Sequence, residues 1–176
     1  MKKPPTIKGV FVMSHVNALV RAKGEKALKE LVERCGRRVH FTGSEDVPIR
    51  IEVLILEHVL DMLAGKKIAA GKREYEAGKL HFNNFAQTPL GEIVLLFNFK
   101  TALMRAPWIA RRVFRGVEFS SKPTGKNTVE IIMGNNDYPL EHFQGFFKAW
   151  MQHLKLKGTV RAKEKAGEYI YTVKWK

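Results

Sequence analysis

The stretch from Tyr138 to Lys176 constrains the fold most, because a strongly amphipathic segment is followed directly by a β-hairpin pattern. Pro139 stands at a first-turn position, and apolar residues then recur at three- and four-residue steps: Leu140, Phe143, Phe146, Phe147, Trp150, Met151 and Leu154. This spacing predicts a helix with one wide apolar face. Beyond it, Thr159 to Lys165 and Glu168 to Trp175 flank the two-residue turn Ala166-Gly167. We therefore expect this helix to cover a sheet that contains the hairpin.

The first part of the chain predicts helices separated by glycine and proline. Ser14 is the predicted cap of a helix to about Lys23, and a second helix is expected over residues 25–34, ended by Gly36. Residues 37–46 are polar and read as a loop. Pro48 then opens a very apolar helix, expected over residues 49–64 and ended by Gly65. Its composition predicts a central position in the fold.

The middle of the chain predicts further helices and then two strands. Small residues over 66–87 favour a closely packed helix, since the Ala-Gly-Lys triplets there do not have phosphate-loop spacing. Thr88-Pro89 is expected to start a buried helix to about residue 105, and Pro107 a short one closed by Gly116. Residues 117–121 and 128–133 read as strands. The prediction is a single α+β domain over residues 1–176: a helical part (1–116), then a ββαββ unit (117–176) forming a four-stranded antiparallel sheet with the long helix packed on it.

The composition and charge of the chain limit the kinds of partner that it can have. The chain has 176 residues, 45% of them hydrophobic, and a formal net charge of +14. With one cysteine, no signal-type apolar core near the start and no membrane-spanning run, we expect a cytoplasmic protein. Most basic residues are spread along the chain, which is typical of a solvated surface. Arg111, Arg112 and Arg115 form a tighter group that is a candidate polyanion site.

Motifs for common enzyme chemistry are absent from the sequence. There is no Gly-x-Ser-x-Gly, His-Glu-x-x-His, Cys-x-x-Cys or Gly-x-Gly-x-x-Gly pattern. His40 follows Cys35 at five residues, but no second pair completes a tetrahedral set, so no metal site is predicted. Glu52 and Glu57 are expected to be solvated, and His58 to be a core histidine. We therefore favour a non-enzymatic role.

A family resemblance is carried by short motifs along nearly the whole chain: Lys8-Gly9-Val10-Phe11, Glu76-Ala77-Gly78-Lys79, Thr88-Pro89-Leu90-Gly91, Ala106-Pro107, Arg111-Arg112 and Tyr171-Thr172-Val173-Lys174-Trp175. With these motifs the chain resembles a myxobacterial family of unknown function. That family is similar to the group of the four-vinyl-reductase-like domain, the haem nitric-oxide-binding domain and the Golgi-transport ligand-binding fold. The resemblance implies a helical part and a sheet that enclose an apolar cavity for a hydrophobic or porphyrin-like molecule.

Two branches of this group imply specific ligands. The haem branch needs a histidine on the helix before the sheet and a Tyr-x-Ser-x-Arg segment; this chain has no histidine between His81 and His142 and lacks the segment. Haem is therefore not expected, and no cofactor is predicted. The Golgi-transport branch carries an acyl chain on a cysteine, for which Cys35 is the candidate. Neighbouring arginines are expected to lower its thiol pKa, although a semi-buried, inert thiol is the favoured interpretation.

Three functional hypotheses remain open. The first is a non-catalytic small-molecule-binding or sensory domain, whose pocket residues are predicted to be Phe97, Phe99, Met104, Trp108, Phe143, Phe147 and Trp150. The second is a nucleic-acid or anionic-membrane-surface binder that uses the three arginines, with exposed Tyr169 or Tyr171 stacking on bases. The third is a scaffold module that forms a homodimer.

Overall fold

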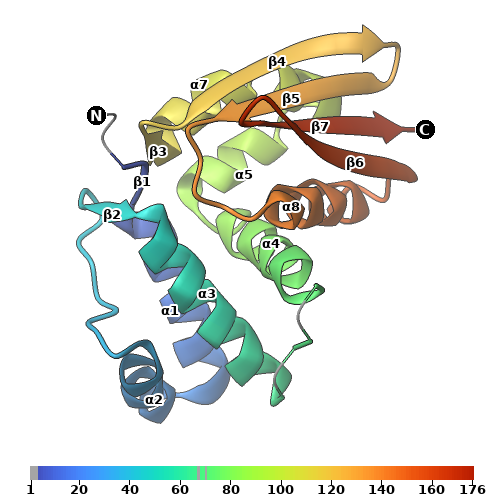
Figure 1. Cartoon of the computed structure of the whole chain (residues 1–176). Coiled ribbons are helices and arrows are strands. Elements are labelled where there is room, and N and C mark those ends of the chain that lie inside the picture. The colour runs from blue at the N-terminus through green and yellow to red at the C-terminus, as the bar shows by residue number, and fades with distance from the viewer. Residues whose placement is uncertain (1–3, 67, 70) are drawn as a thin grey trace.

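The computed structural model describes residues 4–66, 68–69 and 71–176. Figure 1 shows α1, α2 and α3 packed together at one end and a four-stranded sheet at the other, with α4 and α8 between them. The α+β class predicted from the sequence is confirmed. Met1 to Lys3, in the stretch examined for a signal sequence, and Lys67 and Ala70, near the start of the helix predicted over 66–87, lie outside the described residues.

The N-terminal helices follow the sequence pattern closely, but three short strands were not predicted. The elements are β1 (Thr6–Lys8), α1 (Gly9–Lys23), α2 (Glu25–Cys35), β2 (Asp46–Pro48) and α3 (Ile49–Ala64). β1 pairs antiparallel with β2 and with β3 (Phe114–Arg115). Strands of two or three residues are too short to show an alternating pattern, and the partners are distant in sequence. The predicted cap at Ser14 is wrong, because α1 already begins at Gly9 and the Ser14 hydroxyl donates to the Phe11 carbonyl inside it.

The central helix α3 positions the site described below. Its bounds agree with the sequence prediction, and Gly65 ends it in the left-handed conformation with φ of 66°. Ile55, Leu56 and Val59 are fully buried. One polar residue of the helix, Glu52, is also fully buried, and it lies on the side of α3 that meets α1 and α4.

Two glycines allow α4 (Arg73–Phe85) and α8 (Leu140–His153) to pack with their backbones close together. A Cβ placed on Gly78 would lie 1.7 Å from the His142 carbonyl oxygen, and one on Gly145 would lie 2.0 Å from the Tyr75 carbonyl oxygen. Only glycine fits such an approach. The contact brings the side chains of the two helices, including His81 and His142, against one another.

The apolar segment after Thr88 forms two short helices instead of the single buried helix predicted to residue 105. They are α5 (Pro89–Leu95) and α6 (Phe99–Met104), followed by α7 (Ala106–Val113). Asn98 starts α6, because its side chain accepts a hydrogen bond from the Thr101 amide at 2.9 Å. The break places Leu96 on the surface, where it is 85% exposed. An apolar run around a helix axis therefore did not imply full burial here.

The C-terminal part is an antiparallel sheet in the order β4-β5-β7-β6, with α8 on one face (Figure 1). Its strands are β4 (Glu118–Gly125), β5 (Thr128–Gly134), β6 (Gly158–Lys165) and β7 (Glu168–Trp175). The turn between β6 and β7 falls at Ala166 and Gly167, with φ of 52° and 78°. Ile131 and Tyr171 are register partners and both are fully buried on the face that meets α8. In the described part of the chain, no helix is long and apolar enough to cross a membrane.

Candidate functional site

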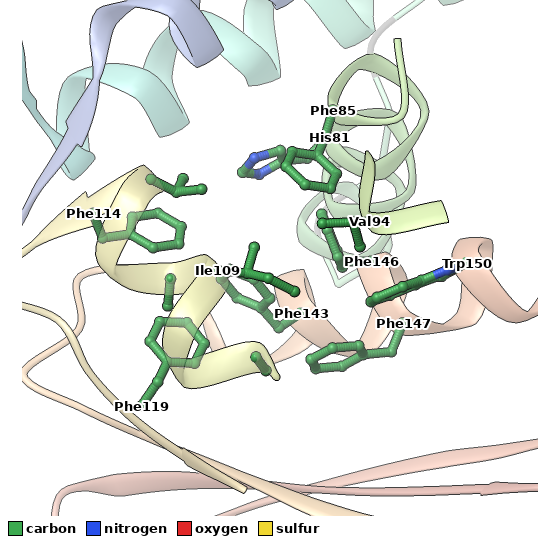
Figure 2. Close-up of a pocket in the computed structure, with 13 residues that line it drawn as sticks. His81, Phe85, Val94, Ile109, Phe114, Phe119, Phe143, Phe146, Phe147 and Trp150 are labelled. Carbon is green, nitrogen blue, oxygen red and sulfur yellow. The ribbon is translucent and has the colours of Figure 1, made fainter. Parts of the chain in front are cut away.

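An apolar pocket of about 60 Å³ lies where α4, α5, α7 and α8 meet β3 and β4 (Figure 2). Aromatic and aliphatic side chains make up nearly all of its wall, and the polar member is His81. The lining residues are His81, Phe85, Val94, Ala106, Ile109, Ala110, Val113, Phe114, Phe119, Phe143, Phe146, Phe147 and Trp150. A pocket of this composition can hold an apolar molecule by dispersion contacts and burial of apolar surface.

The structure brings three of the seven predicted pocket residues together. Phe143, Phe147 and Trp150 of α8 all line the pocket. Phe99 packs behind it, with its ring centroid 5.3 Å from that of Trp150. The other three predicted residues, Phe97, Met104 and Trp108, are not in the pocket wall.

Trp108 corrects the predicted pocket most clearly. It is 40% exposed, and the Arg112 guanidinium lies 3.6 Å from its ring centroid. On the short helix α7, the residues that face inward are Ile109, Ala110 and Val113, so Trp108 is left on the solvent side. The three- and four-residue spacing of these inward-facing residues could have predicted this wall of the pocket. The sequence analysis selected the large tryptophan side chain instead.

His81 connects the pocket to a buried polar cluster that the sequence analysis did not predict. His15 Nε2 of α1 lies 2.9 Å from Glu52 Oε1 of α3, and His81 Nδ1 of α4 lies 3.6 Å from the same oxygen. On the far sides, His15 Nδ1 is 3.0 Å from the Asn84 side-chain amide and His81 Nδ1 is 2.9 Å from His142 Nε2. All five side chains are buried. The expectation that Glu52 is solvated is therefore wrong.

Burial determines the ionisation of this cluster. Loss of water lowers the pKa of His15 to about 3 and that of His81 to about 4, so both imidazoles are neutral near pH 7. Burial likewise raises the pKa of the Glu52 carboxyl, and the positive charge that His81 carries when protonated and the Tyr138 hydroxyl lower it by less. Burial and then the Glu52 carboxylate raise the pKa of the Tyr138 phenol, which places Tyr138 beside the same group.

The candidate reactive thiol, Cys35, is semi-buried at the end of α2. Burial raises the pKa of the Cys35 thiol, and the positive charge of Arg37 offsets only part of this rise. The expectation that neighbouring arginines lower its pKa is therefore wrong, since desolvation outweighs their attraction, and the position of Cys35 agrees with the favoured interpretation of a semi-buried thiol.

Two other expectations about single residues are also corrected. Tyr171 is fully buried and its hydroxyl donates to the Leu140 carbonyl at 3.0 Å, so it does not stack on bases. His58 is partly exposed and is not a core histidine. The candidate polyanion residues Arg111, Arg112 and Arg115 are all exposed, on α7 and β3, and their role stays a prediction.

The fold is that of the H-NOX domains. A solved oxygen-binding H-NOX domain related to soluble guanylate cyclases is 18% identical, with a TM-score of 0.69 over 96% of this chain and 95% of that one. A structure from work on haem distortion in the H-NOX family is 17% identical, with a TM-score of 0.67 and coverage of 96% and 95%. An Fe(II) unliganded mutant H-NOX protein from K. algicida is 10% identical, with a TM-score of 0.65 and coverage of 96% of both chains.

The sequence gives a more specific relationship. Residues 3–176 match the family described as protein of unknown function DUF2378, and the chain belongs to this family. No curated protein matches it in sequence.

The pocket does not fit the haem that the fold class implies. Sites for ligands of drug size have volumes of roughly 300–1,000 Å³, whereas this pocket has about 60 Å³ and is filled from several sides by phenylalanine rings. None of its lining residues is an arginine or lysine that could pair with the propionates. The pocket of this chain is therefore too small and too apolar to hold haem.

Proposed function

We propose that this protein is a non-catalytic small-molecule-binding sensory domain, and that its ligand is a small apolar molecule held in the pocket of Figure 2. The observation that carries the proposal is the pocket itself: about 60 Å³ lined by aromatic and aliphatic side chains from four helices and two strands. An empty apolar cavity of about 150 Å³ binds benzene or xenon, so a smaller one favours a ligand of only a few heavy atoms.

The position of the pocket supports a sensory role. It lies between α7 and the helix pair α4 and α8, and α8 in turn covers the sheet. A ligand that binds one arrangement of these elements more tightly than another shifts the population toward it. The structural neighbours include an oxygen-binding H-NOX domain, which supports a small ligand for a chain of this fold. The nucleic-acid and dimerising-scaffold hypotheses stay predictions.

Xenon is a suitable probe because it is apolar, monatomic and without hydrogen-bonding groups. We expect NMR spectra recorded under increasing xenon pressure to show saturable shifts confined to the methyl groups of pocket residues such as Val94, Ile109 and Val113. Ala110→Leu, which fills the pocket from α7, should reduce these shifts. Ala22→Leu on the exposed face of α1 is the matched control and should leave them unchanged. Shifts that are absent, or equal in both variants, would contradict the proposal.

A further inference from the structure

Three donor side chains from three different helices converge in the interior. Atoms of His15 (α1), Glu52 (α3) and His81 (α4) that can bind a metal all lie within 4.8 Å of one another, and the three residues are buried. Two imidazoles and one carboxylate form a donor set typical of zinc sites and of non-haem iron(II) sites. We propose that these three residues bind a divalent first-row transition-metal ion, at a site that does not depend on the proposed pocket ligand.

The spacing of the donors suits such an ion. Metal–nitrogen and metal–oxygen bonds of about 2.0–2.2 Å in tetrahedral geometry place neighbouring ligand atoms about 3.3–3.6 Å apart. The observed separations from Glu52 Oε1 are 2.9 Å to His15 Nε2 and 3.6 Å to His81 Nδ1. Two of the three separations are therefore close to those of a tetrahedral site, and the third, between His15 and His81, is within 4.8 Å, so side-chain adjustments can admit the ion while the helices remain in place.

Several polar atoms around the site have no hydrogen-bond partner. Glu52 Oε2, the Tyr138 hydroxyl and His142 Nδ1 are buried and make no hydrogen bond of ordinary geometry, although the Tyr138 hydroxyl lies close to the Glu52 carboxyl. Orphaned buried polar atoms cost roughly 1–3 kcal/mol each, and such groups commonly mark an ion or water site. Among the described residues, no lysine or arginine forms an ion pair with Glu52. A divalent cation would supply the positive charge that the Glu52 carboxylate lacks. It would bind the second carboxylate oxygen directly or through a bridging water.

The residues behind the ligands can orient them. When Nε2 of a histidine binds a metal, its Nδ1 carries the proton and donates it to a neighbour. His15 Nδ1 is 3.0 Å from the Asn84 side-chain amide, whose oxygen accepts this proton once the amide is turned by half a rotation. His142 Nε2, 2.9 Å from His81 Nδ1, lies next to the remaining coordination position. Because His81 also lines the apolar pocket, the metal stands at the polar end of that pocket.

The first experiment uses metal-stripped protein in a Cys35→Ser background, titrated with Co²⁺ and Zn²⁺ and, without oxygen, Fe²⁺. We expect one ion per chain, and a Co²⁺ spectrum with the intense d–d bands of four- or five-coordination. Glu52→Gln and His81→Gln should each weaken binding more than about 100-fold, and Asn84→Ala about 10–100-fold, as for orienting residues. His40→Gln and His153→Gln, at exposed histidines, are the matched controls and should bind as the wild type does.

The second experiment does not depend on the folding of any variant. X-ray absorption of the wild-type cobalt or zinc complex should show two imidazole ligands and oxygen, with no sulfur. Absence of stoichiometric binding by the folded wild type would overturn the proposal and leave a neutral hydrogen-bonded cluster with a protonated Glu52. Loss of binding in the exposed-histidine variants, or an oxygen-only shell, would assign the ion to the surface and overturn it equally.

Discussion

Replacing Val94 with isoleucine is expected to stabilise the protein, because the added methylene enters the apolar pocket instead of a filled core. Val94 is 1% exposed and lines the pocket. At about 24 cal/mol per Å³, an unfilled space of about 60 Å³ costs the fold about 1.4 kcal/mol. One buried methylene contributes about 0.8 kcal/mol, which lies within that limit and corresponds to a rise in Tm of about 2–3 °C for a chain of this size.

The matched control is Val129→Ile on β5, where the side chain is fully buried and outside the pocket. An extra methylene in a filled core costs about 1–3 kcal/mol by forcing side chains out of their preferred rotamers. Urea unfolding of the wild type and both variants measures the difference, provided that the m-value is unchanged. If Val94→Ile destabilises the protein as much as Val129→Ile does, no free space lies beside Val94 and the reasoning about the pocket is refuted.

The remaining predictions concern packing, the thiol, and two of the three tryptophans. Gly78→Ala is expected to lower the unfolding free energy by more than about 4 kcal/mol, because its Cβ would lie 1.7 Å from a backbone oxygen of α8. Gly43→Ala, whose Cβ meets only a side-chain carbon at 3.8 Å, should leave the melting temperature nearly unchanged, and equal effects would contradict the close helix contact. The alkylation rate of Cys35 should rise with pH to a midpoint above the ordinary thiol pKa of 9.0, because burial favours the neutral thiol. A midpoint below 9.0 in the pH–rate profile would show that the arginines dominate. Trp108→Ala, at a 40% exposed residue, should lower the unfolding free energy by less than about 1 kcal/mol, whereas Trp150→Ala, at a 5% exposed one, should lower it by about 3–5 kcal/mol. Chemical denaturation distinguishes these values, and similar losses would contradict the surface position of Trp108.

The sequence by itself determined those elements that depend on interactions between residues close together in the chain. The bounds of α3 follow from a continuous helical pattern between Pro48 and Gly65. The β6–β7 turn follows from the left-handed conformation that Ala166-Gly167 can adopt. The apolar face of α8 was visible as a stripe of aromatic residues, and all four of them line the pocket. In each case the deciding interactions join residues close together in the chain, so the pattern is written within one short window.

Tertiary structure decided which of these elements meet, and therefore the site. His15 and Glu52 are 37 residues apart, and Asn84 is 69 residues from His15, so no motif of fixed spacing marks their convergence. His81 meets His142 because α4 and α8 touch at two glycines, a contact that needs both helices in place. The same packing buried Glu52, which an isolated helix would expose to water. Burial, and with it the pKa of a group and the space beside it, depends on every element that surrounds the residue, and short-range patterns do not carry that information.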